Sequence, residues 1–487
     1  MAPVRAEICT QPYNQVFMAT AVTTRPSSSF WASVREALRG SHQDYTAGSL
    51  TRAIFLLAVP MVLEMLMESL FAIVDVFWVA RLGAESMATV GLVEAMLTVM
   101  YAVGMGLGLS ATAMVARRVG EKDREGAAVA GVQAITLGLL AGLSMGLPCL
   151  YLAPHLLRLM GASPAVLAVG TSYARIALGG CCVVLLLILN NAVFRGAGDA
   201  AIAMRVLWLA NSINLILDPC LIFGLGPFPR LGVTGAAVAT FTGRSIGVLY
   251  QFYRLFRGGE HIRILARQVR IHAEIMARLH RVSLTGIAQM LVPHIAWISL
   301  MRIVSVFGNA ALAGYAIAIR IIVFFILPAW GLSGAAATLV GQNLGARRPE
   351  RAEQTVWKTG VYTALVMGGV GVFFIVYSVP VVHLFTHDPK IVSLGAACLR
   401  IVSIGNIGYA YEMVMMQAFN GAGDTLTPTI VNFFGFIVLE IPLAYALAIP
   451  LGMHSNGVYW AITVSESAIA VAMVILFRRG RWKAKKI

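Results

Sequence analysis

The chain has 487 residues, of which 59% are hydrophobic and only 12% are charged. This composition excludes a soluble globular protein and indicates a polytopic membrane protein. The net charge of +15 raises the question of a nucleic-acid partner, but the distribution of the basic residues, described below, argues against one.

Residues 1–49 precede the first long apolar segment. They are polar and lack the long apolar core of a signal peptide, so we predict a cytoplasmic N-terminal tail. An amphipathic pattern over residues 30–39 favours either a helix on the membrane surface or, alternatively, a disordered tail.

The first apolar segment, residues 53–80, is long enough to cross a bilayer as a helix and nevertheless contains three acids. Glu64, Glu68 and Asp75 fall within a stripe about 40° wide on one helical face. Acids at membrane depth are costly unless they face protein or a water-filled cavity, so this face predicts part of a transport pathway. For Glu64 and Glu68, pairing with buried arginines in a packed bundle is the alternative.

Eleven further apolar segments have the length and composition of membrane-spanning helices. We therefore predict an all-α, polytopic protein. The twelve expected spans are residues 53–80, 87–115, 126–153, 164–193, 201–224, 233–255, 276–306, 311–340, 356–384, 391–419, 426–450 and 456–477.

The lysines and arginines gather on one side of this arrangement. The odd-numbered loops between spans hold four of the 37 basic residues, whereas the even-numbered loops and the C-terminal tail hold many more. By the positive-inside rule, both termini and all even loops are expected in the cytoplasm. The positive charge therefore orients the protein in its membrane and gives no indication of nucleic-acid binding.

The chain contains an internal repeat. The sequence Phe-Arg-Gly-Ala-Gly-Asp at 194–199 returns as Phe-Asn-Gly-Ala-Gly-Asp at 419–424, an offset of 225 residues, and the same offset pairs Gly83 with Gly308 and Gly120 with Gly345. The repeat predicts two pseudo-symmetric six-helix lobes related by an axis along the membrane normal. The expected divisions are residues 1–49 (tail), 50–256 (N-lobe, helices 1–6), 257–275 (basic cytoplasmic linker, expected as an amphipathic helix), 276–478 (C-lobe, helices 7–12) and 479–487 (basic cytoplasmic tail).

The acids of the N-lobe are absent from the equivalent positions of the C-lobe. At the offset of 225, Asp75 corresponds to Leu300 and Asp218 to Leu443. Asn211, Asn214 and Asp218 also share one helical face, followed by Pro219. Amide, carboxylate and freed carbonyl oxygens suit Na⁺ or a proton, so we predict a one-sided cation site. Hydrogen bonding between packed helices is the alternative for these side chains.

The C-lobe has acids of its own, of which Glu412 lies deep in its span and is the best candidate for a second site. Glu440 and Glu466 have an alternative role, which is pairing with arginines. The candidates for that pairing are Arg302, Arg320 and Arg400.

Three segments together resemble the multidrug and toxic compound extrusion (MATE) family over about residues 49–480. They are Val-Asp-Val-Phe-Trp-Val-Ala-Arg-Leu-Gly at 74–83, the paired Gly-Ala-Gly-Asp loops, and Asn-Leu-Ile-Leu-Asp-Pro at 214–219. The resemblance implies a twelve-helix antiporter of the bacterial cytoplasmic membrane. It implies export of cationic or amphipathic compounds in exchange for H⁺ or Na⁺.

The resemblance also implies specific residues. In the DinF-like branch of the family, the cation site matches Asp75, Asn214, Asp218 and Thr240 of this sequence. The other branch, which is NorM-like, carries acids on helices 7 and 10, but the span at 282–306 has none, so coupling in the N-lobe is favoured. Outside this pattern, Glu64, Glu68, Asn211 and Glu412 are expected in a proton path or substrate cavity.

The function expected from these features is secondary active antiport by alternating access. Its partners are expected to be small organic cations or amphipathic compounds and membrane lipids, with the chain acting as a monomer and without a cofactor other than the coupling ion. The alternative is a flippase for a lipid or lipid-linked oligosaccharide, for which Arg175, Arg244 and Arg302 would bind phosphate. An enzyme is not expected, because no nucleophile, metal-binding or phosphate-binding motif is present.

Overall fold

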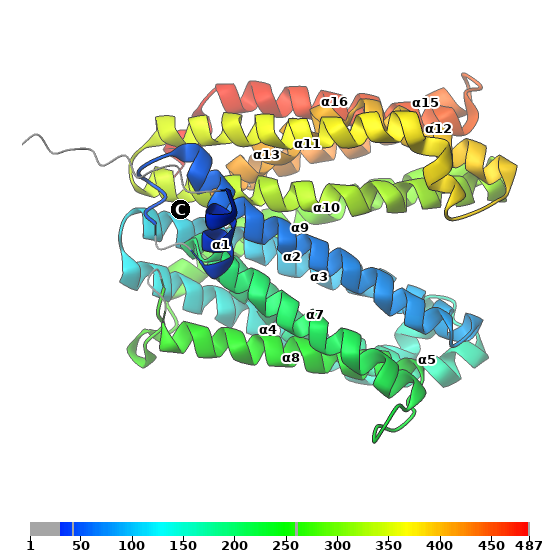
Figure 1. The fold of residues 1–487 in the computed structure, drawn as a ribbon, viewed down its shortest axis with the longest axis horizontal. Helices are drawn as coiled ribbons and strands as arrows, with labels where there is room; N and C mark the ends of the chain where they lie inside the picture. The colour runs from blue at the N-terminus through cyan, green and yellow to red at the C-terminus, as the bar shows by residue number, and fades with distance from the viewer. Residues whose placement is uncertain (1–29, 41–42, 259–261, 486–487) are drawn as a thin grey trace, which may run out of the picture.

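The computed structural model describes residues 30–40, 43–258 and 262–485, and these residues form long helices and short connections. Figure 1 shows two groups of nearly parallel helices, one built from the first half of the chain and the other from the second. The groups lie close together at the end that carries α1 and the C-terminus, and diverge toward the opposite end.

Within the described residues, each lobe contains six helical passages. The N-lobe consists of α2 (Leu50–Ala80), α3 (Ala84–Gly120), α4 (Arg124–Leu159), α5 (Pro164–Gly179) with α6 (Cys181–Ala197), α7 (Ala200–Phe223) and α8 (Val233–Arg257). The C-lobe consists of α9 (Ala273–Ser305), α10 (Asn309–Gly345), α11 (Pro349–His383), α12 (Pro389–Ile404) with α13 (Asn406–Gly421), α14 (Leu426–Asn432) with the π-helix η2 (Phe433–Glu440) and α15 (Ile441–Ala448), and α16 (His454–Arg478).

The all-α, membrane-spanning fold class is confirmed. Within the described residues, ten spans are long and apolar enough to cross a membrane, and α12 with α13, bent by 57°, forms an eleventh if counted as one. The predicted span at 233–255 corresponds to α8, which is long enough but less apolar, because Arg244 and several threonines interrupt it.

The backbone repeats its special conformations at the offset of 225 residues. Gly83 and Gly308, which precede α3 and α10, have φ angles of 99° and 98°. Gly198 and Gly423, in the paired Gly-Ala-Gly-Asp loops, have φ angles of 93° and 80°. Because side chains other than glycine rarely adopt such angles, these glycines allow the same turns in both lobes. The breaks after α5 and α12, at Gly180 and Gly405, also obey the offset.

The lobes touch through reciprocal glycine contacts. A Cβ atom at Gly120 would lie 2.0 Å from Gln342 O, and one at Gly345 would lie 2.1 Å from Arg117 O. Because Arg117 and Gln342 are themselves 225 residues apart, the contact is the same one made twice, as expected of two lobes related by a pseudo-twofold axis. Small residues allow this close approach of two backbones. The predicted internal repeat is therefore a structural one.

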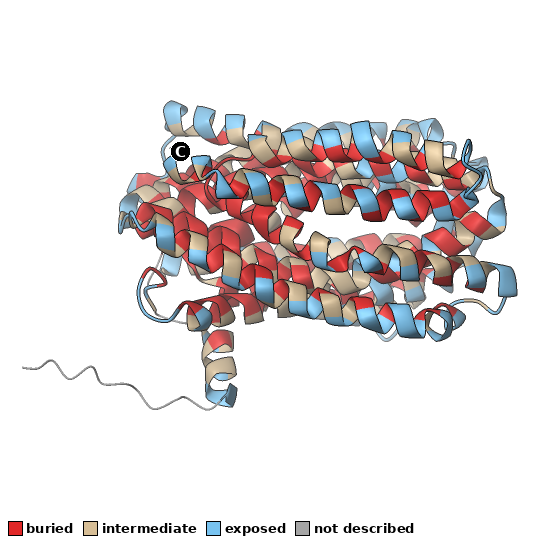
Figure 2. Ribbon diagram, turned by 90° about the horizontal axis from the view of Figure 1, so that it is seen from above, coloured by how far each residue is buried: buried red, intermediate tan, exposed pale blue. Residues whose placement is uncertain are grey.

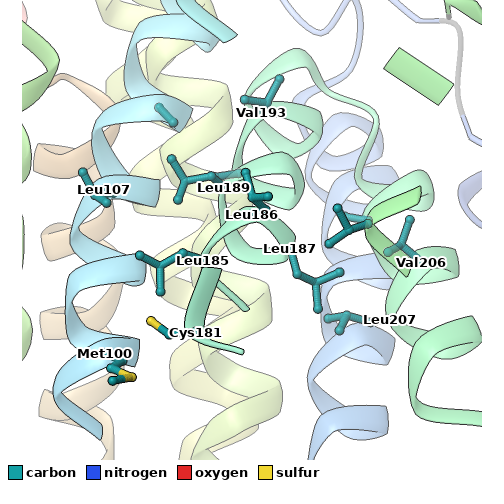
Figure 3. Packing of buried hydrophobic residues seen from close by; sticks show 14 of the residues in the cluster. Met100, Leu107, Cys181, Leu185, Leu186, Leu187, Leu189, Val193, Val206 and Leu207 are labelled. Carbon is teal, nitrogen blue, oxygen red and sulfur yellow. The ribbon is translucent and has the colours of Figure 1, made fainter. Parts of the chain in front are cut away.

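Buried residues concentrate inside each lobe and at the end where the lobes meet, while many residues on the outer helices are exposed (Figure 2). In the N-lobe, leucines of α6, including Leu185 and Leu189, pack near Leu107 of α3 (Figure 3). The exposed residues include large apolar ones such as Tyr151 and Leu365, at 80% and 70%. Exposed apolar side chains on spanning helices are suited to contact with lipid.

The N-terminal segment forms a helix, α1 (Phe30–Arg39), where the sequence favoured either a surface helix or disorder. Its Glu36 is paired with Arg52 of α2 at 2.7 Å. The following residues reach the C-lobe, because the Arg348 guanidinium donates to Thr46 O at 2.7 Å and that of Arg351 to Ala47 O at 2.9 Å. The segment thus connects both lobes at their closed end. The part of the predicted tail at 1–29 lies outside the described residues.

The expectation of an amphipathic helix in the linker at 257–275 is wrong. Within its described residues, this segment contains only the short 3₁₀-helix η1 (Ala266–Gln268) before α9 begins. The reason is that it packs against the N-lobe in an extended form. Ile262 is buried in the N-lobe core, and the Gln133 side chain donates to Arg270 O at 2.7 Å.

Candidate functional site

A cavity of about 640 Å³ lies between the two lobes. Its wall combines apolar and aromatic side chains, such as Trp297 and Trp330, with buried polar groups. The acids that line it are Glu64 of the N-lobe and Glu412, Glu440 and Glu466 of the C-lobe. An apolar cavity with a few carboxyl groups suits an amphipathic cation.

The predicted cation site forms a compact group inside the N-lobe. The Asn214 side-chain amide donates to Asp218 Oδ1 at 3.1 Å and to Thr240 Oγ1 at 3.0 Å. Asn214 and Asp218 lie on α7, one turn apart, and Thr240 lies on the adjacent α8. Asp218 and Asn214 are fully buried, with exposures of 0% and 2%. The structure therefore brings together three of the four residues implied by the family resemblance through direct hydrogen bonds.

The fourth residue, Asp75 of α2, is close enough to Asp218 for an electrostatic interaction. Asp75 Oδ1, Asp218 Oδ2 and Asn214 Oδ1 are buried and have no hydrogen-bond partner among the described residues. Buried polar atoms are normally satisfied, so three unsatisfied oxygens from one group point to a bound species. Hard oxygen ligands of this kind fit either H⁺ or Na⁺.

The acids Glu64 and Glu68 are both paired with arginines, as the packing alternative expected. Glu64, which is 1% exposed, lies 3.1 Å from Arg195 and also lines the cavity. Glu68 lies 3.8 Å from Arg244 and accepts from the Asn211 amide at 3.0 Å. Glu68 and Asn211 do not belong to the cavity wall. Of these two acids, only Glu64 is therefore placed where it can meet a substrate in the cavity.

Arg244 of α8 is a component that the sequence analysis did not assign to this site. It is 8% exposed, and its guanidinium donates to the Tyr101 hydroxyl at 2.6 Å as well as pairing with Glu68. It also interacts electrostatically with Asp75. Its position four residues after Thr240 puts both on one helical face, a signal that was available in the sequence. Arg244 thus connects Glu68 to the predicted cation site, which consists of Asp75, Asn214, Asp218 and Thr240.

We expect Arg244→Gln to lower the thermal stability of the purified protein, because Glu68 and Tyr101 would lose a buried partner. Breaking one side of a buried ion pair costs about 3–5 kcal/mol, and the partial exposure of Glu68 makes the lower end of that range the expected loss. Adding Glu68→Gln should recover part of the loss, since no carboxylate then remains unpaired. Thermal unfolding of the two single variants and the double variant measures this coupling.

Arg158→Gln, at an exposed position of α4, is the control and should unfold at the wild-type temperature. If the effects of Arg244→Gln and Glu68→Gln simply add, the two side chains are not coupled, and the network described above is wrong.

Three acids of the C-lobe, Glu412, Glu440 and Glu466, were candidates for pairing with arginines. In the part of the chain that the structure describes, no salt bridge involves Glu412, Glu440 or Glu466. The alternative of pairing with Arg302, Arg320 or Arg400 is therefore wrong. Arg320 is instead close enough to Glu94 of the other lobe for an electrostatic interaction.

The chain was compared with known families and proteins. The MatE family model matches residues 60–220 and 285–446, one match in each lobe. A probable multidrug resistance protein NorM of Thermotoga maritima is 24% identical over 435 residues, covering 88% of this chain and 93% of the relative. The multidrug export protein MepA of Staphylococcus aureus is 22% identical, covering 87% of this chain and 93% of the relative. A FAD transporter of Shewanella oneidensis is 24% identical, covering 84% and 90%.

Comparison with solved structures leads to the same family. A crystal structure of a MATE protein in complex with MaL6 has a TM-score of 0.84 and 28% identity, with 90% of this chain and 98% of that chain covered. An outward-facing multidrug resistance MATE family transporter of the MOP superfamily also has a TM-score of 0.84 and 28% identity, with 90% and 97% covered. With a family model matched in both lobes, this chain belongs to the MatE family of membrane transporters.

Proposed function

We propose that the protein is a secondary active antiporter that exports cationic or amphipathic compounds in exchange for H⁺ or Na⁺. The observation that carries this proposal is the cavity between the lobes, whose wall places four acids, three of them buried, among aromatic and apolar side chains. Such a wall attracts positively charged groups and can pack against the apolar surface of a substrate. The names of the Thermotoga and Staphylococcus relatives support multidrug export.

The proposed coupling site is the group formed by Asp75, Asn214, Asp218 and Thr240. It does not line the cavity, so the coupling ion and the substrate would bind at separate places. Binding of a cation there would neutralise the two aspartates and favour one arrangement of the lobes over the other. Differential affinity of the coupling ion for the two arrangements is what drives exchange.

The proposed orientation follows from the charge distribution. The basic loops lie at the end where Gly120 and Gly345 close the lobes together. If this end faces the cytoplasm, the lobes diverge outward, as in the outward-facing relative. We propose a multi-pass protein of the bacterial cytoplasmic membrane, monomeric, with both termini inside, acting as a transporter and not as an enzyme.

The flippase alternative gains no support. A phosphate-binding groove needs unpaired arginines, but Arg175, Arg244 and Arg302 are not part of the cavity wall, and Arg195, which is, pairs with Glu64. FAD, which is named as the cargo of the Shewanella relative, is an anion, and the four acids of the cavity wall would repel it.

The proposal is tested by dye export from energised inverted vesicles that contain the protein. Ethidium is the fluorescent cation, and the pH gradient and the Na⁺ gradient are collapsed separately. Transport should stop with one of the two collapses and persist with the other, which identifies the coupling ion. Transport that survives both collapses, or its absence in intact gradients, would refute ion-coupled export of cations.

A further inference from the structure

The short helix α1 (Phe30–Arg39) lies beside the end of the molecule where the two lobes meet (Figure 1). It projects sideways from the bundle, across the direction of the long helices (Figure 2). Its last turn is attached to the N-lobe, because Ala37 is buried and the Arg205 guanidinium donates to Arg39 O at 3.0 Å. Since the long helices cross the membrane, a helix that runs across their direction lies along the membrane surface.

The contact between α1 and the first span places α1 at the boundary of the bilayer. The Phe30 ring meets the Phe55 ring of α2 edge to face, with the centroids 5.8 Å apart. Phe55 follows the start of α2 at Leu50 by about 8 Å along the helix. The apolar part of α2 begins at Ala53, directly after Arg52. The first turn of α1 therefore lies where the span enters the apolar part of the membrane.

The exposed side of α1 is apolar. Phe30 and Trp31 are 64% and 76% exposed, and their rings contact each other with the centroids 5.6 Å apart. Val34 and Leu38 are partly buried and fall with them in an arc about 100° wide. Exposed rings of this size are unfavourable in water, whereas Trp, Phe and Leu form the apolar face of helices that lie in the membrane interface.

A basic side follows this apolar arc. Arg35 and Arg39 are exposed, and helical geometry places both next to the edge of the arc that carries Trp31. Neither arginine has a salt-bridge partner in the part of the chain that the structure describes. Glu36, the acid of this helix, faces the protein, since it pairs with Arg52 at 2.7 Å. The exposed surface of α1 therefore combines aromatic rings with positive charge that no acid neutralises.

A lipid surface fits this helix better than a protein partner does. A helix of 10 residues is about 15 Å long, whereas a stable interface buries about 800 Å² on each partner. Aromatic residues beside arginines are typical of helices in the membrane interface, and anionic lipids attract the arginines. Membership in the MatE family predicts nothing about α1, because the residues matched by the family model begin at residue 60.

We infer that α1 is an anchor that binds anionic phospholipids. Phe30 and Trp31 insert among the lipid chains of the leaflet at the closed end, and Arg35 and Arg39 bind the phosphate groups of its lipids. The residues that follow α1 bind arginines of the C-lobe, so the anchor attaches both lobes to one leaflet. The inference goes beyond the proposed transport and does not depend on its substrate or coupling ion.

The test measures how close Trp31 lies to lipid chains in the full-length protein, with one copy in each lipid nanodisc. The discs contain a fixed share of phosphatidylcholine with brominated chains, which quench tryptophan fluorescence, and the remaining lipid is either phosphatidylcholine or phosphatidylglycerol. The signal of Trp31 is the difference between each protein and the same protein with Trp31→Phe. We expect quenching that is stronger with phosphatidylglycerol and that weakens at high salt, because salt screens the charges.

The double variant Arg35→Gln with Arg39→Gln should remove the increase that phosphatidylglycerol causes, because each arginine near an anionic surface strengthens binding by about fivefold. Arg35→Lys with Arg39→Lys should retain the increase, since the positive charges are kept. Arg124→Gln with Arg278→Gln is the matched control. It removes two exposed positive charges near the starts of α4 and α9 and should behave as wild type.

If Trp31 is not quenched in either lipid, the inference is wrong. It is also wrong if phosphatidylglycerol leaves the quenching unchanged, or if the glutamine variant responds as the wild type does. Shielding of Trp31 from aqueous acrylamide only in discs with two copies would show that this face binds a second copy of the chain, which overturns the inference as well. Dye export plays no part in the measurement, so a failure of the proposed function does not affect its result.

Discussion

Asp218→Asn is expected to reduce ion-driven dye export by at least about tenfold, because an amide cannot take up and release a proton or supply a full negative charge to Na⁺. Asp218 is completely buried and accepts a hydrogen bond from Asn214, while its second oxygen lacks a partner in the described chain. The substitution keeps the shape of the side chain, so the fold should persist. Initial rates of ethidium export in energised vesicles, at matched protein levels, measure the effect.

A matched control is Glu350→Gln, which removes one acid from an exposed position at the start of α11. Its export rate should equal that of the wild type. Substrate binding by Asp218→Asn should also remain, since the aspartate lies outside the cavity wall. If the double variant Asp75→Asn with Asp218→Asn exports dye at the wild-type rate, the proposed coupling site does not couple export to the ion gradient.

Gly120→Ala is expected to open the end at which the lobes meet. The added Cβ would lie 2.0 Å from Gln342 O, an atom of the opposite backbone that has no freedom to rotate away. Overpacking of this kind costs about 1–3 kcal/mol, and 1.4 kcal/mol changes a two-state ratio tenfold, so the closed arrangement should become about ten times less favoured. Spin labels at Glu125 and Glu350, exposed positions related by the repeat, report the separation of the lobes by pulsed electron resonance.

Gly91→Ala is the control in the same helix, because a Cβ there meets nothing within 4 Å. The distance distribution for Gly91→Ala should match the wild type, and that for Gly120→Ala should gain a longer component. Gly345→Ala, the repeat-related change, should act in the same direction. Unchanged distances in both lobe-contact variants would show that this glycine contact does not hold the lobes together.

Much of the fold could be predicted from the sequence because membrane helices and repeats leave strong local signals. Each predicted apolar span corresponds to a helical passage, and the offset found in the two Gly-Ala-Gly-Asp loops reappears in the φ angles of Gly198 and Gly423. The linker was not predictable in the same way. Its apolar residues have helical spacing, but Ile262 is buried against a lobe, and only the tertiary structure provides that partner.

The candidate site, too, could be predicted only in part from the sequence. Helical periodicity placed Asn214 and Asp218 on one face, and the structure joins them by a hydrogen bond. Helical periodicity says nothing about contacts between helices that are distant in sequence, so the bonds from Arg244 to Tyr101 and from Asn211 to Glu68 could not be derived. Sequence spacing describes one helix at a time, whereas these contacts depend on how helices pack.

The residues before α2 restrict how the two lobes can move relative to each other. Arg348 and Arg351 of the C-lobe bind the carbonyl groups of Thr46 and Ala47, while Glu36 of the same segment is held by Arg52 of the N-lobe. Any rocking that parts the lobes at this end must first release one of those two attachments. The segment before α2 therefore links the two lobes across the boundary at which they would move. A purification tag or truncation placed within it would change the turnover rate of the transporter.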